Sequence, residues 1–103
     1  MAVTEITSAE EFHETISAGG KVVVDFWASW CGPCQMMKPV LQELANAYPQ
    51  VRVASVDVDE VPQPAMALQI DTIPAFVLFE NGKPVKKAIG AMPLEGLAGT
   101  LGI

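Results

Sequence analysis

Basic residues are scarce in this chain. Six lysines and arginines stand against twelve aspartates and glutamates, which gives a net charge of −6 at pH 7. A general nucleic-acid surface needs clustered basic side chains to neutralise phosphates, so we expect no nucleic-acid partner. Long apolar runs are also missing: stretches such as residues 22–24 and 74–79 are far shorter than the roughly 20 residues of a transmembrane helix. We therefore expect no membrane span.

The N-terminal residues lack the basic and apolar regions of a secretory signal peptide. We therefore expect a cytoplasmic protein. Thiols are kept reduced in that compartment, where a cysteine pair is more often catalytic or metal-binding than structural. A chain of 103 residues, half of them hydrophobic, is large enough for one domain with a real core and too small for two. We predict a single domain over residues 1–103, and a monomer.

The period of the hydrophobic pattern changes along the chain. A nearly continuous apolar run at residues 22–28 is typical of a strand covered on both faces. Apolar residues recur at helical spacing over residues 32–48, and valines mark a strand over residues 51–58. Further predicted elements are a helix capped by Ser8 and ended by Gly19 and Gly20, a short helix over 62–68, strands over 75–80 and 84–89 joined by Asn81 and Gly82, and a helix over 93–101. This order indicates an α/β fold with a mixed sheet.

Two further expectations concern single side chains. Lys86 and Lys87 suit an edge strand, where charge blocks pairing with another sheet. Met36, Met37 and Met66 are expected to fill gaps in the core rather than to bind a ligand.

The two cysteines lie in residues 30–34, which read WCGPC and stand where a strand ends and a helix begins. Residues three apart share one helical face, about 5–6 Å apart at Cβ, so the two sulfurs can cycle between dithiol and disulfide. At the helix N-terminus, free N–H groups and the dipole lower the pKa of the Cys31 thiol. We therefore predict Cys31 as the nucleophile. Cys34, one turn further in and less exposed, is predicted to be the resolving thiol.

A zinc site and a structural disulfide compete with this interpretation. Zinc usually needs four ligands, but the chain has two cysteines and a single histidine, His13, in a different predicted helix. Asp57, Asp59 and Glu60 resemble a solvated strand end without a compact ligand pattern. A disulfide across so short a loop removes little entropy from the unfolded chain. A redox pair is therefore favoured, with no metal or other cofactor.

Asp25 is a lone carboxylate in the apolar run of residues 22–28. The residues alone leave two interpretations open. Burial would disfavour the charged form and raise the pKa of Asp25. A place at the solvated end of the strand would leave it an ordinary surface acid.

Several stretches together closely resemble the thioredoxin family. They are residues 25–34 (DFWASWCGPC), 56–59 (VDVD), 73–74 (IP), 79–83 (FENGK) and 89–91 (IGA), and their order and spacing extend the resemblance over essentially the whole chain. The resemblance implies the thioredoxin fold, a central mixed five-stranded sheet flanked by about four helices. It also implies a protein disulfide reductase whose redox group is its own cysteine pair.

The resemblance further implies roles for single residues. Pro74 should follow a cis peptide bond, which would leave the Ile73 backbone free to pair with an extended substrate segment. Asp25 should be buried behind Cys34 and accept its proton, directly or through water, during the resolving step. A flat apolar docking surface is implied for seven residues: Trp30, Gly32, Pro33, Ile73, Pro74, Gly90 and Ala91.

Two positions depart from the family pattern. Many bacterial thioredoxins carry a lysine where this chain has Ser55, and often a basic residue where it has Gln35. With less positive charge nearby, we expect a higher pKa for Asp25 and less electrostatic help for Cys31.

By the same resemblance, protein disulfides are the expected substrates, and an NADPH-dependent flavoenzyme, thioredoxin reductase, is the expected electron donor. Three alternatives stay open: an oxidant or isomerase with the same chemistry, a binding module that does not use its thiols, and a zinc-binding domain. Gly32 and Pro33 between the cysteines, together with the lack of a signal peptide, favour the reductase.

Overall fold

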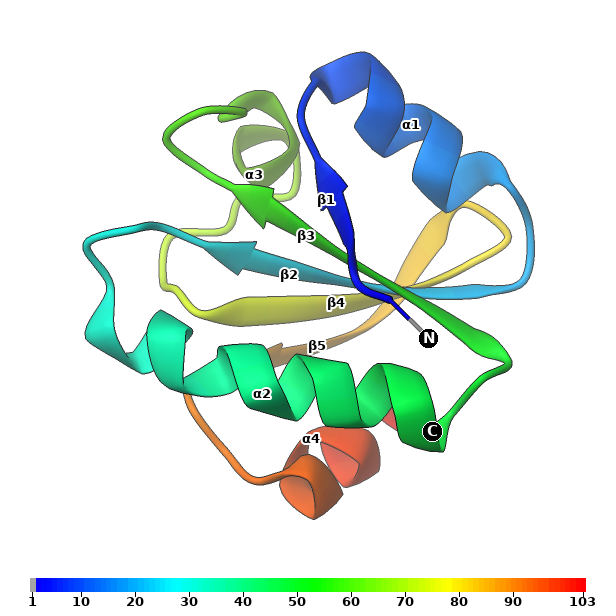
Figure 1. The fold of residues 1–103 in the computed structure, drawn as a ribbon. Coiled ribbons are helices and arrows are strands. Elements are labelled where there is room, and N and C mark those ends of the chain that lie inside the picture. The colour runs from blue at the N-terminus through cyan, green and yellow to red at the C-terminus, as the bar shows by residue number, and fades with distance from the viewer. Residues whose placement is uncertain (1) are drawn as a thin grey trace.

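Five strands form one mixed sheet at the centre of the molecule. The computed structural model describes residues 2–103. The strands are β1 (Thr4–Ile6), β2 (Lys21–Trp27), β3 (Val51–Asp57), β4 (Ala75–Glu80) and β5 (Lys83–Ile89), and they lie in the order β1-β3-β2-β4-β5 (Figure 1). β1 and β2 run parallel to β3, whereas β4 is antiparallel to both β2 and β5. This confirms the expected five-stranded mixed sheet.

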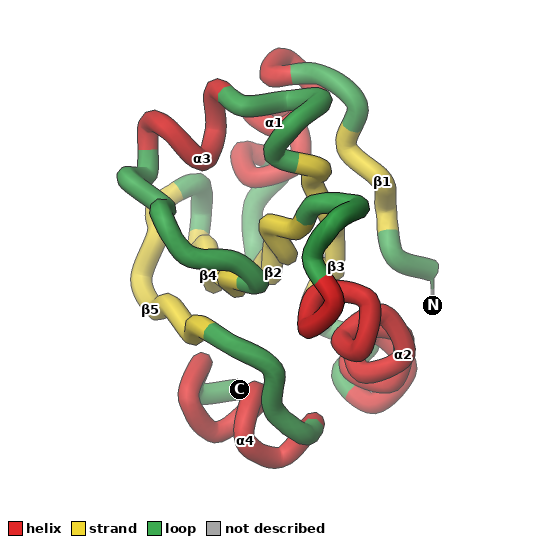
Figure 2. Tube along the Cα trace, turned by 90° about the vertical axis from the view of Figure 1, so that its left-hand side faces the viewer, coloured by secondary structure: helices red, strands yellow, loops and turns green. Residues whose placement is uncertain are grey.

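Within residues 2–103, four helices cover the two faces of the sheet. They are α1 (Ala9–Ser17), α2 (Gly32–Ala47), α3 (Gln63–Ala67) and α4 (Leu94–Leu101). Figures 1 and 2 show α1 and α3 on one face and α2 and α4 on the other. Val22, Val24 and Phe26 of β2 belong to one apolar cluster, and Val23 belongs to the other. Helices cover both faces of β2, which explains why its residues are nearly all apolar.

The turns follow the local sequence. The Ser8 hydroxyl caps α1 by accepting a hydrogen bond from the Glu11 N–H at 3.0 Å. The Glu11 carboxylate in turn accepts from the Thr7 N–H at 2.8 Å, one residue before the cap. Asn81 and Gly82 both have positive φ and form the predicted two-residue turn between β4 and β5.

The residue pattern missed one strand, and one sequence expectation needs correction. The residue pattern alone marked no strand at Thr4–Ile6, because three residues are too few to show a period. Met36 and Met66 are 69% and 73% exposed, so the prediction that they fill the core was wrong, and it holds only for Met37, 1% exposed. Adjacent helical residues point about 100° apart, so Met36 and Met37 cannot both face the sheet.

Other features of the fold agree with the prediction or extend it. Lys86 and Lys87 lie in β5, which is an edge strand of the sheet, as predicted. The longest helix, α2, has 16 residues, and within residues 2–103 we find no helix with the length and apolarity needed to cross a membrane.

Candidate active site

Cys31 and Cys34 form a disulfide at the N-terminus of α2, with their Cα atoms 5.3 Å apart. Cys31 is the N-cap residue of the helix, and Cys34 lies in its first turn. Cys31 is 5% exposed and Cys34 is 1% exposed. The predicted pairing is present, and Cys34 is the more buried partner, as expected.

The start of α2 directs a hydrogen-bond donor at the Cys31 sulfur. The Cys34 N–H donates to the Cys31 Sγ at 3.2 Å. This N–H is one of the donors that the first turn of a helix leaves without a backbone acceptor. Pro33 has no N–H to satisfy and suits the first turn. The same donor and the helix dipole stabilise negative charge at this position.

The loop before β4 packs against the cysteine pair. The peptide bond between Ile73 and Pro74 is cis, as the resemblance implied. Ile73 is partly buried against the cluster formed by Ala28, Cys31 and Cys34. The disulfide therefore has an apolar neighbour contributed by a distant part of the chain.

The end of β5 approaches the same loop. The Gly90 N–H donates to the Pro74 carbonyl at 2.8 Å. Gly90 and the following Ala91 therefore lie beside the loop that carries Ile73 and Pro74. Exposure differs among the seven predicted docking residues. Trp30, Gly32, Pro33 and Ala91 are exposed, Ile73 and Gly90 are intermediate, and Pro74 is buried.

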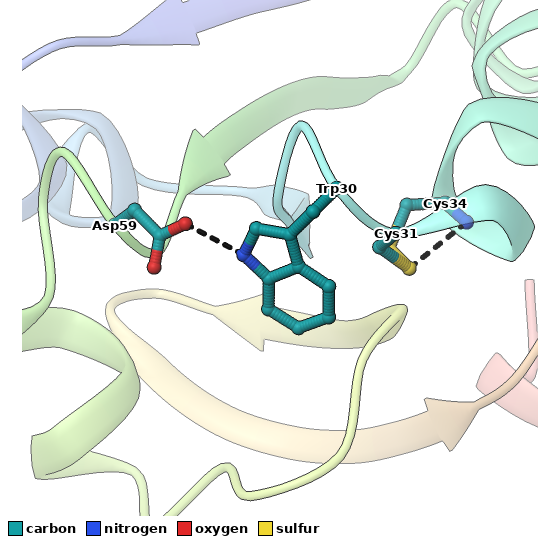
Figure 3. Close-up of a disulfide and its surroundings, with 4 residues drawn as sticks. All are labelled: Trp30, Cys31, Cys34 and Asp59. Carbon is teal, nitrogen blue, oxygen red and sulfur yellow. Dashed lines mark hydrogen bonds between the residues drawn. A yellow bond between two sulfur atoms is a disulfide. The ribbon is translucent and has the colours of Figure 1, made fainter.

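Trp30 is 70% exposed, but its orientation is fixed by a hydrogen bond. Its Nε1–H donates to the Asp59 Oδ2 at 2.7 Å, and the indole nitrogen points away from the disulfide (Figure 3). Asp59 lies in the loop after β3. The residue pattern predicts Asp59 only as part of a solvated strand end. No local pattern reveals this contact, because 29 residues separate the two partners.

Asp25 is buried in the centre of the sheet, at 2% exposure. Burial, followed by the negative charge of Glu5, raises its pKa from the ordinary 3.8 to about 7, while Lys38 acts in the opposite direction. Within residues 2–103, its Oδ1 atom has no hydrogen-bond partner. Of the two interpretations left open by the sequence, the structure supports the buried carboxylate.

A cavity of about 210 Å³ adjoins Asp25. Side chains from β1, β2, β3 and α2 line it, among them Glu5, Ser55 and Lys38. Neither cysteine lines this cavity. Glu5 was not identified from the sequence, because its strand was too short to be recognised.

Metal ligands do not gather at this site. Across residues 2–103, we find no group of three or more histidine, cysteine, aspartate or glutamate side chains arranged to hold a metal ion.

Comparison with known proteins identifies the family. The thioredoxin family profile matches residues 3–102. This chain belongs to the thioredoxin family. It is 44% identical to a thioredoxin of Staphylococcus haemolyticus, over 98% of this chain and 96% of that protein. A Plasmodium falciparum thioredoxin structure superimposes with a TM-score of 0.91 at 35% identity, covering 97% of each chain.

A fused relative was also found. A Mycobacterium leprae protein named bifunctional thioredoxin reductase/thioredoxin is 47% identical over 84% of this chain, which matches 19% of that longer protein. Family membership and the Cys31–Cys34 disulfide together make the chain a thiol–disulfide oxidoreductase, a protein-disulfide reductase.

Proposed function

We propose that the chain is a general reductant of protein disulfides in which Cys31 attacks, Cys34 resolves and Asp25 is the base for the resolving step. The observation that carries this assignment is the geometry at the start of α2. The Cys31 sulfur is the N-cap acceptor, and Cys31 is 5% exposed against 1% for Cys34. A thiolate at this place is stabilised and within reach of a substrate.

The reaction proceeds by two thiol–disulfide exchanges. The Cys31 thiolate attacks one sulfur of the substrate disulfide, forms a mixed disulfide and releases the other substrate sulfur as a thiolate. Cys34 then loses its proton and attacks the Cys31 sulfur. This closes the Cys31–Cys34 disulfide and releases the second substrate thiolate. Two electrons pass from the cysteine pair to the substrate.

Asp25 is proposed to take the Cys34 proton in the second exchange. A general base works best when its pKa lies near the working pH, and burial raises the pKa of Asp25 to about 7. Near neutral pH a substantial fraction of the carboxylate is then free to accept a proton. We propose that the proton passes from Cys34 to Asp25 directly or through a water molecule.

Substrate proteins are proposed to dock on the seven residues named above, which we call the docking surface. Trp30 offers a large apolar ring whose direction is fixed by Asp59. Ile73 packs against the cysteines. No hydrogen bond of its backbone is found among residues 2–103, so its N–H and C=O are available to an extended substrate segment.

Electrons are proposed to come from a flavin-dependent thioredoxin reductase that uses NADPH. The fused Mycobacterium leprae relative, whose name joins the two activities in one protein, supports this partner. We place this electron transport in the cytoplasm, where a dithiol donor keeps thiols reduced, and propose that the chain acts as a monomer. The disulfide is the only redox group that the mechanism requires.

The Cys34→Ser variant tests the two cysteine roles. Without a resolving thiol, the variant should accumulate a mixed disulfide at Cys31, detectable by mass spectrometry with an oxidised model protein. Cys31→Ser is the matched control and should trap nothing. Trapping by Cys31→Ser as efficient as that by Cys34→Ser would contradict the assignment of Cys31 as the nucleophile.

The equilibrium potential of the pair against glutathione separates the reductase from its alternatives. A potential well below that of the glutathione pool is expected for an electron donor. A potential well above it would indicate an oxidant or isomerase. Full biological activity of Cys31→Ser would indicate a binding module that does not use its thiols.

A further inference from the structure

One row of residues crosses the sheet on the face that α2 covers. Glu5 of β1 lies opposite Ser55 of β3, and Ser55 lies opposite Asp25 of β2. Directly paired residues of parallel neighbours point to the same face. The row continues through Phe76 of β4, so it is polar at the β1 end and apolar at the other.

The polar end of this row is held together by contacts. The Ser55 hydroxyl donates to the Glu5 Oε2 at 2.6 Å, and Ser55 is 9% exposed. Glu5, Ser55 and Asp25 all line the same cavity of about 210 Å³. The Ser55 hydroxyl thus keeps the Glu5 carboxylate beside the cavity that Asp25 faces.

Two charged side chains from other elements of the fold act on Asp25. Glu5 lies on β1, two strands away, and its negative charge favours the protonated form of Asp25. Lys38 approaches from α2 and opposes it, while its ammonium lies 4.1 Å from the centroid of the Trp27 ring. The row partners on β3 and β4, Ser55 and Phe76, carry no charge. After burial, Glu5 is therefore the charged neighbour that favours the protonated form of Asp25.

We propose that Glu5, held in place by Ser55, is a positioning residue that sets the pH at which Asp25 can act as the base of the resolving step. This inference rests on the proposed role of Asp25. Two carboxylates two strands apart are separated by roughly 10 Å at the backbone. Glu5 is exposed on the edge strand β1, and its hydrogen bond with Ser55 keeps the carboxylate beside the cavity, where its charge changes proton binding at Asp25.

The first test is the titration of the Asp25 carboxyl, followed by carbon NMR in the oxidised protein, in which neither cysteine titrates. In Glu5→Gln the midpoint should fall by about 0.5 to 1 pH unit, because a repelling charge is removed. Glu14→Gln is the matched control: Glu14 is exposed on α1, which covers the opposite face. Its effect should stay below about 0.2 pH unit. An equal shift in both variants would overturn the proposal.

Ser55→Ala tests whether the hydroxyl acts through Glu5. The single variant should lower the Asp25 midpoint by less than Glu5→Gln does. Adding Ser55→Ala to Glu5→Gln should then change nothing further, because the carboxylate that Ser55 positions is already gone. Additive shifts in the double variant would contradict a role for Ser55 in holding Glu5.

A kinetic measurement separates this inference from the proposed function. The rate at which Cys34 resolves a preformed mixed disulfide is followed against pH in wild type and Glu5→Gln. The acid limb of the profile should move with the Asp25 midpoint and by the same amount. If the midpoint moves and the profile does not, Asp25 is not the base, although Glu5 still controls its proton. If the midpoint does not move, the inference about Glu5 fails.

Discussion

Asp59 and Asp25 are both carboxylates, but the regions around them have opposite character. Asp59 lies in an exposed loop and accepts a hydrogen bond from the Trp30 indole at 2.7 Å. Asp25 lies in the central strand at 2% exposure, and within residues 2–103 its Oδ1 has no hydrogen-bond partner. The same functional group is solvated in one region and desolvated in the other.

The two environments give the carboxylates different chemical roles. Water stabilises a charged carboxylate, so Asp59 serves as a hydrogen-bond acceptor that orients an aromatic ring. In the sheet the charged form is costly, so the proton affinity of Asp25 rises until it can exchange a proton near neutral pH. We therefore expect changes at Asp25 to alter pH dependence and changes near Asp59 to alter substrate binding.

The largest expected effect is on stability at the buried carboxylate. The pKa of Asp25 is about 7 in the folded chain against an ordinary 3.8. Between these two pH values the folded chain keeps a proton that the unfolded chain has released. The free energy of unfolding therefore falls as the pH rises, by about 4 kcal/mol in total. Asp25→Asn should remove this loss of stability. Urea unfolding of the oxidised wild type and variant between about pH 4 and pH 8 measures the free energy of unfolding of each. Parallel stability curves for wild type and variant would contradict the buried, protonated state.

The next largest effect is on the resolving step. Asp25→Asn should slow the closure of the Cys31–Cys34 disulfide from a mixed disulfide by about 10²-fold, the usual contribution of a general base. Attack by Cys31 on the substrate should slow much less. Rapid acid quenching followed by mass spectrometry separates the two steps. Equal slowing of both would mean that Asp25 supports the site as a whole rather than accepting the Cys34 proton.

A smaller effect is expected at the docking surface. Trp30→Ala should raise KM for a protein substrate by about 10-fold, as for other large aromatic contacts. Its stability should change by less than about 0.5 kcal/mol, because the side chain is 70% exposed. Steady-state reduction of a protein disulfide gives KM and kcat separately. A fall in kcat with no change in KM would argue against Trp30 as a docking residue.

The smallest effect is expected at Asp59. Asp59→Ala should raise KM by about two- to threefold, since the indole stays present but loses the hydrogen bond that fixes it. Trp30 fluorescence should change in parallel. Glu60→Ala, at the neighbouring exposed position, is the control and should alter neither. A KM effect as large as that of Trp30→Ala would show that Asp59 itself contacts the substrate.

Local sequence predicted much of this molecule because the relevant forces act over a few residues. Helical periodicity predicted α2, with an observed range of Gly32–Ala47, and the Asn81-Gly82 pair predicted the hairpin turn. The WCGPC motif predicted that Cys31 stands at a helix start with Cys34 one turn on, and the structure confirms that geometry.

Neither the contact between Trp30 and Asp59 nor the row from Glu5 through Ser55 to Asp25 could be predicted in this way. β1 is only three residues long, and it becomes a strand because β3 offers it a hydrogen-bonding edge. The residue pattern therefore could not show that Glu5 would lie in line with Asp25.

By itself, the sequence determined the redox pair, its helix cap and the alternation of strands and helices, because these depend on neighbours along the chain. Only the tertiary structure decided that Asp25 is buried, that Glu5 shares its cavity and that Ile73 packs against the disulfide. Proton affinity depends on the groups and the solvent that surround a carboxyl in space. Those surroundings come from strands and helices that are distant in sequence.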